Sequence, residues 1–380
     1  MAPVQPRTDE PPAPLDAIIV GAGPIGLETG VALKAAGLRT TVIDAGCIGA
    51  TIDWWAPGTT FFSSPERIAI AGVPLVPPDQ AKATREQYLA YLRGVARQFD
   101  LPLRLFTRVD RIERDAEAPH GGFIVEVTPS LHGVGGPEER RRTPSAARAS
   151  RLRARHVVLA IGDLHRPRML DVPGEELPHV SHFLDDPHRS FGRRTLVVGG
   201  KNSAVEAAIR LFRVGAAVAI SYRGERFDPA RVKYWLRPEI EWLIEQGRIA
   251  FHPRTSVARI GPERVDLMSE ADGATRTLDA DRVFLLTGYE QSPTLFEEAG
   301  IALEGEARAP KLDMTTMETN VPGLFVAGTA VAGTQTRARV FIENSHEHVE
   351  RICRRIAGSG VPWETAGAVG GSSFAGAEES

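Results

Sequence analysis

Residues 16–37, with the sequence DAIIVGAGPIGLETGVALKAAG, constrain the fold more than any other stretch of the chain. They join an apolar run (17–20) that is long enough for a buried parallel strand, a glycine loop, and a helix-forming run (27–36). The loop has the spacing G-x-G-x-x-G; its residues are Gly21, Gly23, Pro24, Ile25 and Gly26.

Each glycine of this loop has a separate physical task. Gly21 allows the tight turn from strand to helix, Gly23 lets a pyrophosphate approach the backbone, and Gly26 lets the helix pack closely on the strand. The start of the helix then offers free N–H groups and a partial positive charge to phosphates. The stretch predicts a dinucleotide site; the alternative is a purely structural glycine turn.

A carboxylate follows at the distance that such a site requires. Residues 40–43 are apolar enough for a second strand, which ends at Asp44, 18 residues after Gly26. An acid near this offset typically accepts hydrogen bonds from the ribose hydroxyls of an adenine dinucleotide. We favour this role over that of an ordinary solvated carboxylate at a strand end.

A second strand, turn and helix begin at Thr195, in TLVVGGKNSAVEAAIRLFRVGA. Compared with G-x-G-x-x-A, Lys201 stands in place of the second glycine. Arg223 lies 19 residues after the alanine and so nearly repeats the offset of Asp44 with the opposite charge. A base there suits the 2′-phosphate of NADP, and Arg226 could add to the charge; the alternative for Arg223 is a surface residue. The loop residues are Gly199, Gly200, Lys201, Asn202, Ser203 and Ala204.

Two dinucleotide units in one chain predict an α/β protein with two Rossmann-like domains. The acidic first unit suits FAD and the basic second unit suits NADPH. Such an arrangement favours hydride transfer from a nicotinamide to a flavin, in which the protein supplies position and electrostatics.

Composition excludes several other classes. The net charge of −3 and the hydrophobic content of 42% indicate neither a nucleic-acid partner nor an acidic one. No apolar run approaches the roughly 20 residues that a membrane span needs. The start of the chain has prolines and acids where a signal peptide needs an apolar core, so we expect a cytoplasmic protein. The two cysteines, Cys47 and Cys353, have no metal-ligand spacing and are expected to be free thiols.

Two further segments leave alternatives open. Phe61 and Phe62, preceded by Thr60, could line a flat ring system or belong to the core. Residues 129–150 are rich in Arg, Gly and Pro and predict an exposed loop between two antiparallel strands. A nucleic-acid patch in this loop is unsupported, because no aromatic residues are interleaved.

The order of GAGPIG, LAIG (159–162), VVGGKNSAVEAA, LLTG (285–288) and GLFVAG resembles the two-dinucleotide flavoproteins related to thioredoxin reductase. The turn at 160–162 resembles the A-T-G turn of that family. The turn at 328–329 resembles its C-terminal G-D turn, with threonine in place of aspartate. The cofactor-binding residues that this resemblance adds are Ala160, Gly162, Gly288, Gly328 and Thr329.

The chain is more similar still to the bacillithiol-disulfide reductase-like branch. The shared stretches are TTFFSSPERIAIAGVP, DVPGEELPHVSHF, VVGGKNSAVEAA, VKYWLRPEIE, METNVPGLFVAG and FIEN. This resemblance implies an FAD-binding domain made of 15–170 and 285–360, with an NAD(P)H-binding domain (171–284) inserted. It also implies a homodimer. We expect a disordered start (1–14) and a flexible tail (361–380).

One residue departs from that branch. The branch carries a candidate redox cysteine in its first glycine loop, where this chain has Ile25. Isoleucine forms neither a thiolate nor a mixed disulfide, so the disulfide-reducing step is in doubt while flavin reduction is not. Cys47 lies on the adenosine side of the expected FAD, and Cys353 is expected to be a packed thiol.

The leading hypothesis is therefore an FAD-dependent NADPH oxidoreductase whose electrons pass to a small-molecule or redox-protein acceptor. The alternatives are a nucleotide-binding redox sensor or scaffold without turnover, and a flavin monooxygenase. We predict no metal site and no catalytic acid/base set. Four ionisable residues could serve as acids or bases near a flavin, but we expect all of them to be structural: Asp281, Glu343, His346 and His348.

Overall fold

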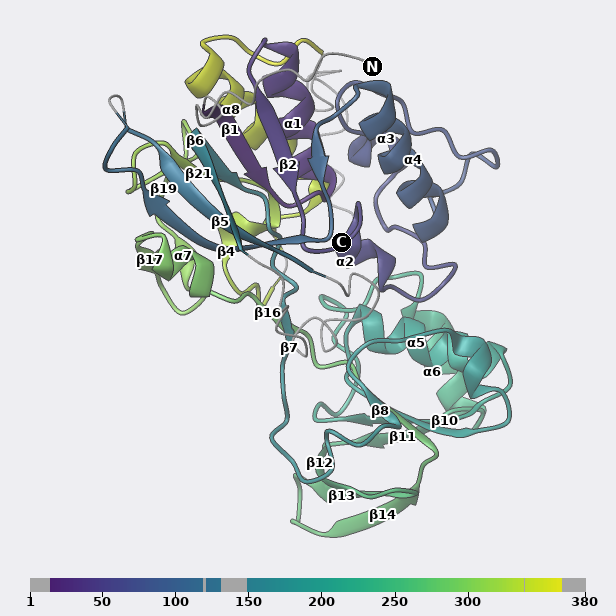
Figure 1. Ribbon diagram of the computed structural model, residues 1–380. Helices are drawn as coiled ribbons and strands as arrows, with labels where there is room; N and C mark the ends of the chain where they lie inside the picture. The colour runs from purple at the N-terminus through teal and green to yellow at the C-terminus, as the bar shows by residue number, and fades with distance from the viewer. Residues whose placement is uncertain (1–13, 119–120, 131–148, 338, 364–380) are drawn as a thin grey trace, which may run out of the picture.

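The computed structural model describes residues 14–118, 121–130, 149–337 and 339–363, which form two stacked units (Figure 1). Most of the predicted disordered start (1–14), of the predicted flexible tail (361–380) and of the Arg-rich loop lies outside these residues. The first unit contains both ends of the described chain. The second unit is inserted between them, so the predicted discontinuous α/β arrangement is confirmed.

A sheet in the order β19-β20-β21-β6-β1-β2-β3 forms the centre of the first unit. Its strands from β21 to β3 are parallel, and β4 and β5 extend from β6 as an antiparallel ribbon. The strands are β1 (Leu15–Val20), β2 (Thr40–Ile43), β3 (Leu103–Arg104), β4 (Thr107–Arg114), β5 (Phe123–Pro129), β6 (Ser150–Leu159), β19 (Leu312–Asp313), β20 (Glu318–Thr319) and β21 (Leu324–Val326).

Helices cover one face of this sheet. The apolar residues of α1, α4 and α8 pack with β1 and β2 in one core cluster, and β5, β6 and α7 pack in a second cluster on the other face. Thr84 caps the start of α4 with a capping box. Its hydroxyl accepts from the Gln87 backbone N–H, and the Gln87 side chain accepts from the Thr84 backbone N–H. The helices are α1 (Pro24–Ala35), α2 (Ala50–Asp53), α3 (Pro65–Ile68), α4 (Arg85–Gln98), α7 (Thr294–Glu298) and α8 (His346–Ala357).

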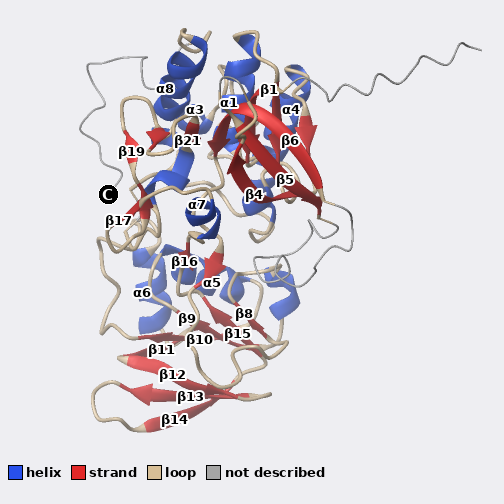
Figure 2. Ribbon diagram, turned by 60° about the vertical axis from the view of Figure 1, so that its left-hand side comes forward, coloured by secondary structure: helices blue, strands red, loops and turns tan. Residues whose placement is uncertain are grey.

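The second unit is a three-layer sandwich (Figure 2). Its parallel sheet has the order β11-β10-β9-β15-β8, with α5 and α6 on one face and an antiparallel sheet of β12, β13 and β14 on the other. The elements are β8 (Val180–Ser181), β9 (Arg194–Val198), α5 (Asn202–Arg213), β10 (Ala217–Tyr222), α6 (Arg237–Glu245), β11 (Ala250–Pro253), β12 (Thr255–Ile260), β13 (Arg264–Ser269), β14 (Thr275–Asp279) and β15 (Arg282–Leu285).

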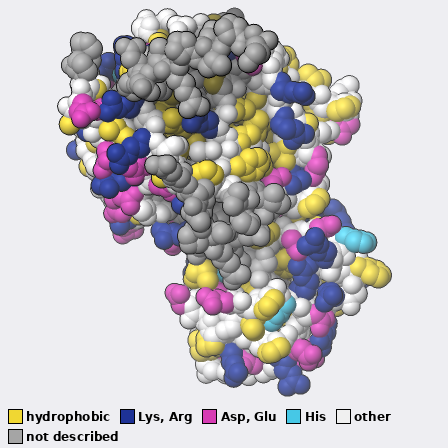
Figure 3. Space-filling model, in the orientation of Figure 1, with side chains coloured by type: hydrophobic (Ala, Val, Ile, Leu, Met, Phe, Trp, Pro, Cys, Tyr) yellow, Lys and Arg dark blue, Asp and Glu magenta, His cyan; other side chains and the backbone are white. Residues whose placement is uncertain are grey.

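Two short paired strands connect the units. The chain enters the second unit after β7 (Arg166–Pro167) and returns through β16 (Tyr289–Glu290), which pairs antiparallel with β7. Figure 3 shows the resulting two lobes with a waist between them and with basic and acidic side chains interspersed over the visible face. The remaining short elements are η2 (Pro187–Ser190), β17 (Leu303–Glu304), β18 (Ala309–Pro310), η3 (Gly328–Ala332) and η4 (Ile342–Asn344).

Local backbone geometry sets several element boundaries. Residues 250–260 form two strands, because Arg254 adopts φ 52° between β11 and β12. The sequence gives little sign of β4, whose bulge between Val109 and Arg111 breaks the alternation of its apolar residues. The 3-10 turn η4 precedes α8, which starts at His346.

Candidate functional site

The first glycine loop lies between β1 and α1, and two of its glycines are required by packing. A Cβ atom on Gly21, whose φ is 111°, would lie 2.2 Å from the Ala160 carbonyl oxygen. A Cβ atom on Gly26 would lie 1.9 Å from the Gly21 oxygen. A Cβ atom on Gly23 would meet no atom within 4 Å, so this glycine borders open space that a ligand can enter.

The start of α1 faces that space without a protein cap. Gly23 is the N-cap residue and has no side chain to cap the helix, and no other described side chain accepts from the first N–H groups. These donors and the helix dipole favour an anion at this position. The site residue Pro24 occupies the first turn, where the missing N–H costs nothing.

Asp44 fixes the same loop from the end of β2. Its Oδ2 accepts from the Ala22 N–H at 2.7 Å, and its Oδ1 accepts from the Gly46 N–H at 2.7 Å. The carboxylate therefore lies beside the glycine loop, as the sequence predicts. Its contact with a ribose stays a prediction.

Two further turns reach the same edge of the sheet. β1, β6 and β21 run in parallel and end at Val20, Leu159 and Val326. The predicted residues that follow β6 and β21 are therefore close together, and a Cβ atom on Gly162 would lie 3.9 Å from the Thr329 hydroxyl. Ligands of open α/β sheets bind at such carboxyl ends. The residues at this edge are Ala160, Gly162, Gly328 and Thr329.

Ile25 is part of the packing at this edge rather than an open surface residue. Its side chain is 6% exposed. A Cβ atom on Gly328 would lie 3.4 Å from the Cβ of Ile25, so the two residues are in close contact. The Thr29 hydroxyl donates to the Ile25 carbonyl at 2.7 Å within α1.

A buried histidine holds the Gly328 turn. Nδ1 of His348 accepts from the Gly328 N–H at 3.2 Å, so this ring nitrogen carries no proton. Burial lowers the pKa of His348 to about 4, and the charges of Arg351 and His346 act in the same direction. The sequence alone did not indicate this contact, because it joins residues 20 positions apart across a turn.

Residues two positions apart on a helix do not face each other, so the spacing of the two histidines predicts different partners for His346. Its Nδ1 lies 2.7 Å from Oε2 of Glu28 on α1, and its Nε2 lies 3.1 Å from the Arg67 carbonyl. Burial opposes the charged imidazolium, but the hydrogen bond to Glu28, the charges of Glu28 and Glu343 and the Arg67 carbonyl together outweigh it and raise the pKa of His346. In the part of the chain that the structure describes, no cluster of three potential metal ligands occurs.

Asp281 has a structural role at the opposite end of the second sheet. It accepts from the Arg194 N–H at 2.8 Å and forms an ion pair with the Arg194 guanidinium at 2.5 Å. The hydrogen bonds from Arg194 lower the pKa of Asp281 to about 2. This residue is therefore a partner of β9 rather than an acid or base.

The second glycine loop repeats the first between β9 and α5. A Cβ atom on Gly199, whose φ is 144°, would lie 2.6 Å from the Leu286 oxygen. A Cβ atom on Gly200 would lie 2.3 Å from the ring of Tyr222. Lys201 is the N-cap residue of α5 and gives it no side-chain cap, so the helix start is again open to an anion.

The polar residues of this loop have distinct partners. Nζ of the exposed Lys201 donates to the Thr336 carbonyl of the first unit at 3.0 Å. Oδ1 of Asn202 accepts from the Lys233 N–H at 2.8 Å. Ser203 is exposed, and Ala204 is buried where it contacts the loop. The predicted roles of these residues toward a nucleotide stay predictions.

Arg223 follows β10 at the position that the sequence predicts. It is exposed, as is Arg226, and neither has an ion-pair partner among the residues that the structure describes. The acid between them, Glu225, pairs instead with Arg254 at 2.7 Å. Both guanidinium groups are therefore available to a phosphate.

The aromatic pair of the first unit divides between two environments. Phe61 is 8% exposed, and its ring packs against Tyr88 at 4.6 Å and Trp55 at 5.1 Å between centroids. Phe62 instead contacts the edge of Trp235 in the second unit at 5.7 Å. The structure therefore places Phe61 in the core and Phe62 at the contact between the units.

Other residues at this contact were missed by the sequence reasoning. Arg210 on α5 donates to the Thr59 hydroxyl at 2.8 Å and also to the Pro57 carbonyl. These contacts of Arg210 join segments about 150 residues apart, and no local sequence pattern predicts them. The predicted site residue Thr60 is exposed and forms a single β-bridge with Thr84 of its own unit.

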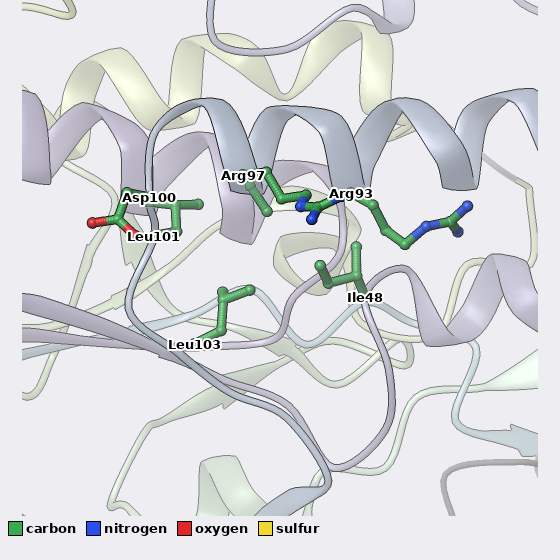
Figure 4. A pocket seen from close by; sticks show the side chains of 7 residues that line it. Ile48, Arg93, Arg97, Asp100, Leu101 and Leu103 are labelled. Carbon is green, nitrogen blue, oxygen red and sulfur yellow. The ribbon is translucent and has the colours of Figure 1, made fainter.

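A shallow hollow of about 540 Å³ lies elsewhere, between α4 and the loop after β2 (Figure 4). The side chains of Arg93 and Arg97 on α4 lie along one side of it, Ile48 and Leu103 lie below them in this view, and Leu101 lies beside Asp100. It contains none of the predicted site residues. The two glycine loops are therefore defined by their backbone geometry and not by this hollow.

Comparison with known proteins decides the family. The family described as pyridine nucleotide-disulphide oxidoreductase matches residues 18–130 and 146–328. The chain belongs to this family. Bacilliredoxin reductase Bdr from Bacillus subtilis (strain 168) is 32% identical over 341 residues, covering 90% of this chain and 97% of the relative.

Two further similarities agree with the family. Bacillithiol disulfide reductase Bdr from Bacillus cereus has a solved structure with a TM-score of 0.80 and 33% identity, covering 90% of this chain and 99% of that chain. A ferredoxin–NADP reductase from Ignicoccus hospitalis is 26% identical over 320 residues, covering 82% of this chain and 89% of the relative. The protein is an FAD-containing, NADPH-dependent oxidoreductase.

The residues present fit these cofactors. Each unit has an uncapped helix start behind a glycine loop, and the open space beside Gly23 would admit a pyrophosphate. The carboxylate of Asp44 lies in the first unit. Arg223 and Arg226, which have no ion-pair partner among the described residues, lie in the second. In the described residues, no helix is long and apolar enough to cross a membrane.

Proposed function

We propose that this protein passes electrons from NADPH through FAD to an acceptor that reacts without a protein thiol. The first glycine loop with Asp44 would hold FAD, and the second loop with Arg223 would hold NADPH. Bound in this way, FAD would supply the chemistry of hydride transfer from a nicotinamide and of electron transfer to an acceptor. The chain positions both groups, excludes water from the edge near Ile25, and supplies charge for the phosphates.

The observation that carries this proposal is the environment of residue 25. The resembled branch has its candidate redox cysteine here, whereas Ile25 packs against Gly328 in this chain. Neither existing cysteine replaces it. Cys353 is 1% exposed inside the core of α8, where burial raises its pKa and disfavours the thiolate. Cys47 follows β2 beside Asp44, on the adenosine side of the proposed FAD site.

The acceptor class follows from the missing thiol. An acceptor that needs a mixed disulfide with residue 25 is disfavoured, although relatives are named as reductases of bacilliredoxin and bacillithiol disulfide. A one-electron redox protein or a quinone reacts at the flavin itself. The similarity to a ferredoxin–NADP reductase favours a ferredoxin-like acceptor as the first candidate to test. We also expect a homodimer, which light scattering would test.

The experiment compares the wild type with Ile25→Cys and the matched control Ile25→Ser, which adds polarity without a thiol. We expect the wild type and Ile25→Ser to reduce ferredoxin or a quinone with NADPH, and to reduce bacillithiol disulfide no faster than free FAD does. Gain of disulfide reduction in Ile25→Cys alone would support the proposal. Rapid disulfide reduction by the wild type would refute it.

A further inference from the structure

Arg168 belongs to the linker by sequence, yet it is fixed at the edge of the second sheet. It directly follows β7. Its N–H donates to the Gly288 carbonyl at 3.0 Å, and its carbonyl accepts from the Thr287 hydroxyl at 2.9 Å. Both partners follow the carboxyl end of β15, so the backbone of Arg168 is held at that edge.

The second glycine loop lies at the same edge. β15 and β9 are parallel neighbours that end together, with Leu285 opposite Val198. The Leu286 N–H donates to the Val198 carbonyl at 2.8 Å, and a Cβ atom on Gly199 would lie 2.6 Å from the Leu286 oxygen. The linker and the start of α5 are therefore adjacent.

The guanidinium of Arg168 has no hydrogen-bond acceptor in the part of the chain that the structure describes. Its Nε is buried and makes no hydrogen bond, and no carboxylate of the described residues pairs with it. Arg282, at the opposite end of β15, differs in this respect, because it pairs with Asp185 at 2.7 Å. Buried donors in folded proteins normally have a partner, so an orphaned guanidinium N–H indicates an acceptor that binds from outside.

A second cation, the ammonium group of Lys201, lies close enough to Arg168 to be affected by its charge. Partial burial lowers the pKa of Lys201, and the charges of Arg231, Arg168 and Arg223 lower it further. Arg231 is offset by Asp228 at 3.2 Å, whereas the Lys201 ammonium contacts, among the described residues, only the Thr336 carbonyl. Converging positive groups without a carboxylate favour a bound anion.

We propose that Arg168 binds the pyrophosphate of NADPH together with Lys201 and the N–H groups at the start of α5. This assignment rests on the proposed function and adds a contact from outside the inserted unit. The pyrophosphate is the anion that lies at a helix start behind a glycine loop, whereas the 2′-phosphate lies beyond the neighbouring strand β10, near Arg223. Nucleotide binding therefore also holds the linker against the second sheet.

The test measures binding by calorimetry on the FAD-loaded protein, with NADP⁺, NAD⁺ and adenosine 2′-monophosphate as probes. We expect Arg168→Gln to weaken both dinucleotides by a similar factor of about tenfold or more, since each loses a charge-assisted contact. Binding of adenosine 2′-monophosphate, which lacks the pyrophosphate, should be unchanged. Arg168→Lys should retain part of the affinity. Arg166→Gln, on the exposed neighbour in β7, should bind all three probes as the wild type does.

Two results would overturn the proposal. The first is wild-type affinity of Arg168→Gln for both dinucleotides; a raised KM for the acceptor in that case would place an anionic acceptor there. The second is a loss confined to NADP⁺ and adenosine 2′-monophosphate, which would place Arg168 at the 2′-phosphate. If the wild type binds NADP⁺ but NADPH does not reduce its flavin, the proposed function fails while the assignment of Arg168 stands.

Discussion

Replacing His348 tests whether a buried neutral histidine holds the Gly328 turn. Its pKa is about 4 in the folded chain, against its ordinary value of 6.5. As the pH falls below 6.5, His348 becomes protonated in the unfolded chain but stays neutral in the folded chain. The free energy of unfolding therefore decreases between pH 6.5 and pH 4. From this group alone, linkage makes the folded state about 2 kcal/mol less stable at pH 4.5 than at pH 7.

The variant His348→Asn separates this effect from other acid-sensitive groups. Its Oδ1 can accept from the Gly328 N–H as Nδ1 of the histidine does, but it does not titrate. We expect the wild type to lose about 2 kcal/mol more than the variant between pH 7 and pH 4.5, measured as free energy of unfolding in urea. An equal loss in both proteins would refute the assigned tautomer and the role of burial.

Three other predictions concern the remaining site residues. Gly26→Ala should abolish retention of FAD, seen as loss of the flavin spectrum, because its Cβ would lie 1.9 Å from the Gly21 oxygen; a fully flavinated variant would contradict this. Arg223→Gln should weaken NADPH binding about tenfold while leaving NADH binding unchanged, and an equal effect on both would show that it does not contact the 2′-phosphate. Because the pKa of His346 is raised, the protonated His346 stabilises the folded state below pH 6.5, and this contribution is lost as the pH rises through the folded pKa. The free energy of unfolding of Glu28→Gln should therefore fall less toward alkaline pH than that of the wild type, and parallel curves for the two proteins would exclude a role of the pair.

The sequence predicted what depends on local spacing. The two strand–glycine–helix units, the offset of Asp44 and the offset of Arg223 each follow from a run of fewer than 30 residues, and the structure places all of them at the carboxyl ends of parallel strands. Spacing also predicted that His346 and His348 would point to different partners, as they do.

What the sequence missed depends on contacts between distant segments. Arg168 reaches the second sheet only because β7 pairs with β16, and His348 reaches Gly328 only because α8 packs beside η3. Phe61 and Phe62 are adjacent and chemically identical, yet one lies in the core and the other at Trp235. Tertiary packing decides such outcomes, and periodicity carries no information about them.

The most direct test of the central claim is an anaerobic titration of the purified flavoprotein with NADPH, followed through the visible flavin band. A flavin without a redox-active protein disulfide should be bleached fully by a single equivalent of NADPH, which supplies two electrons. Addition of ferredoxin or a quinone should then restore the band. A requirement for a second equivalent, with new thiols appearing, would contradict the account, and so would a flavin that NADPH leaves oxidised.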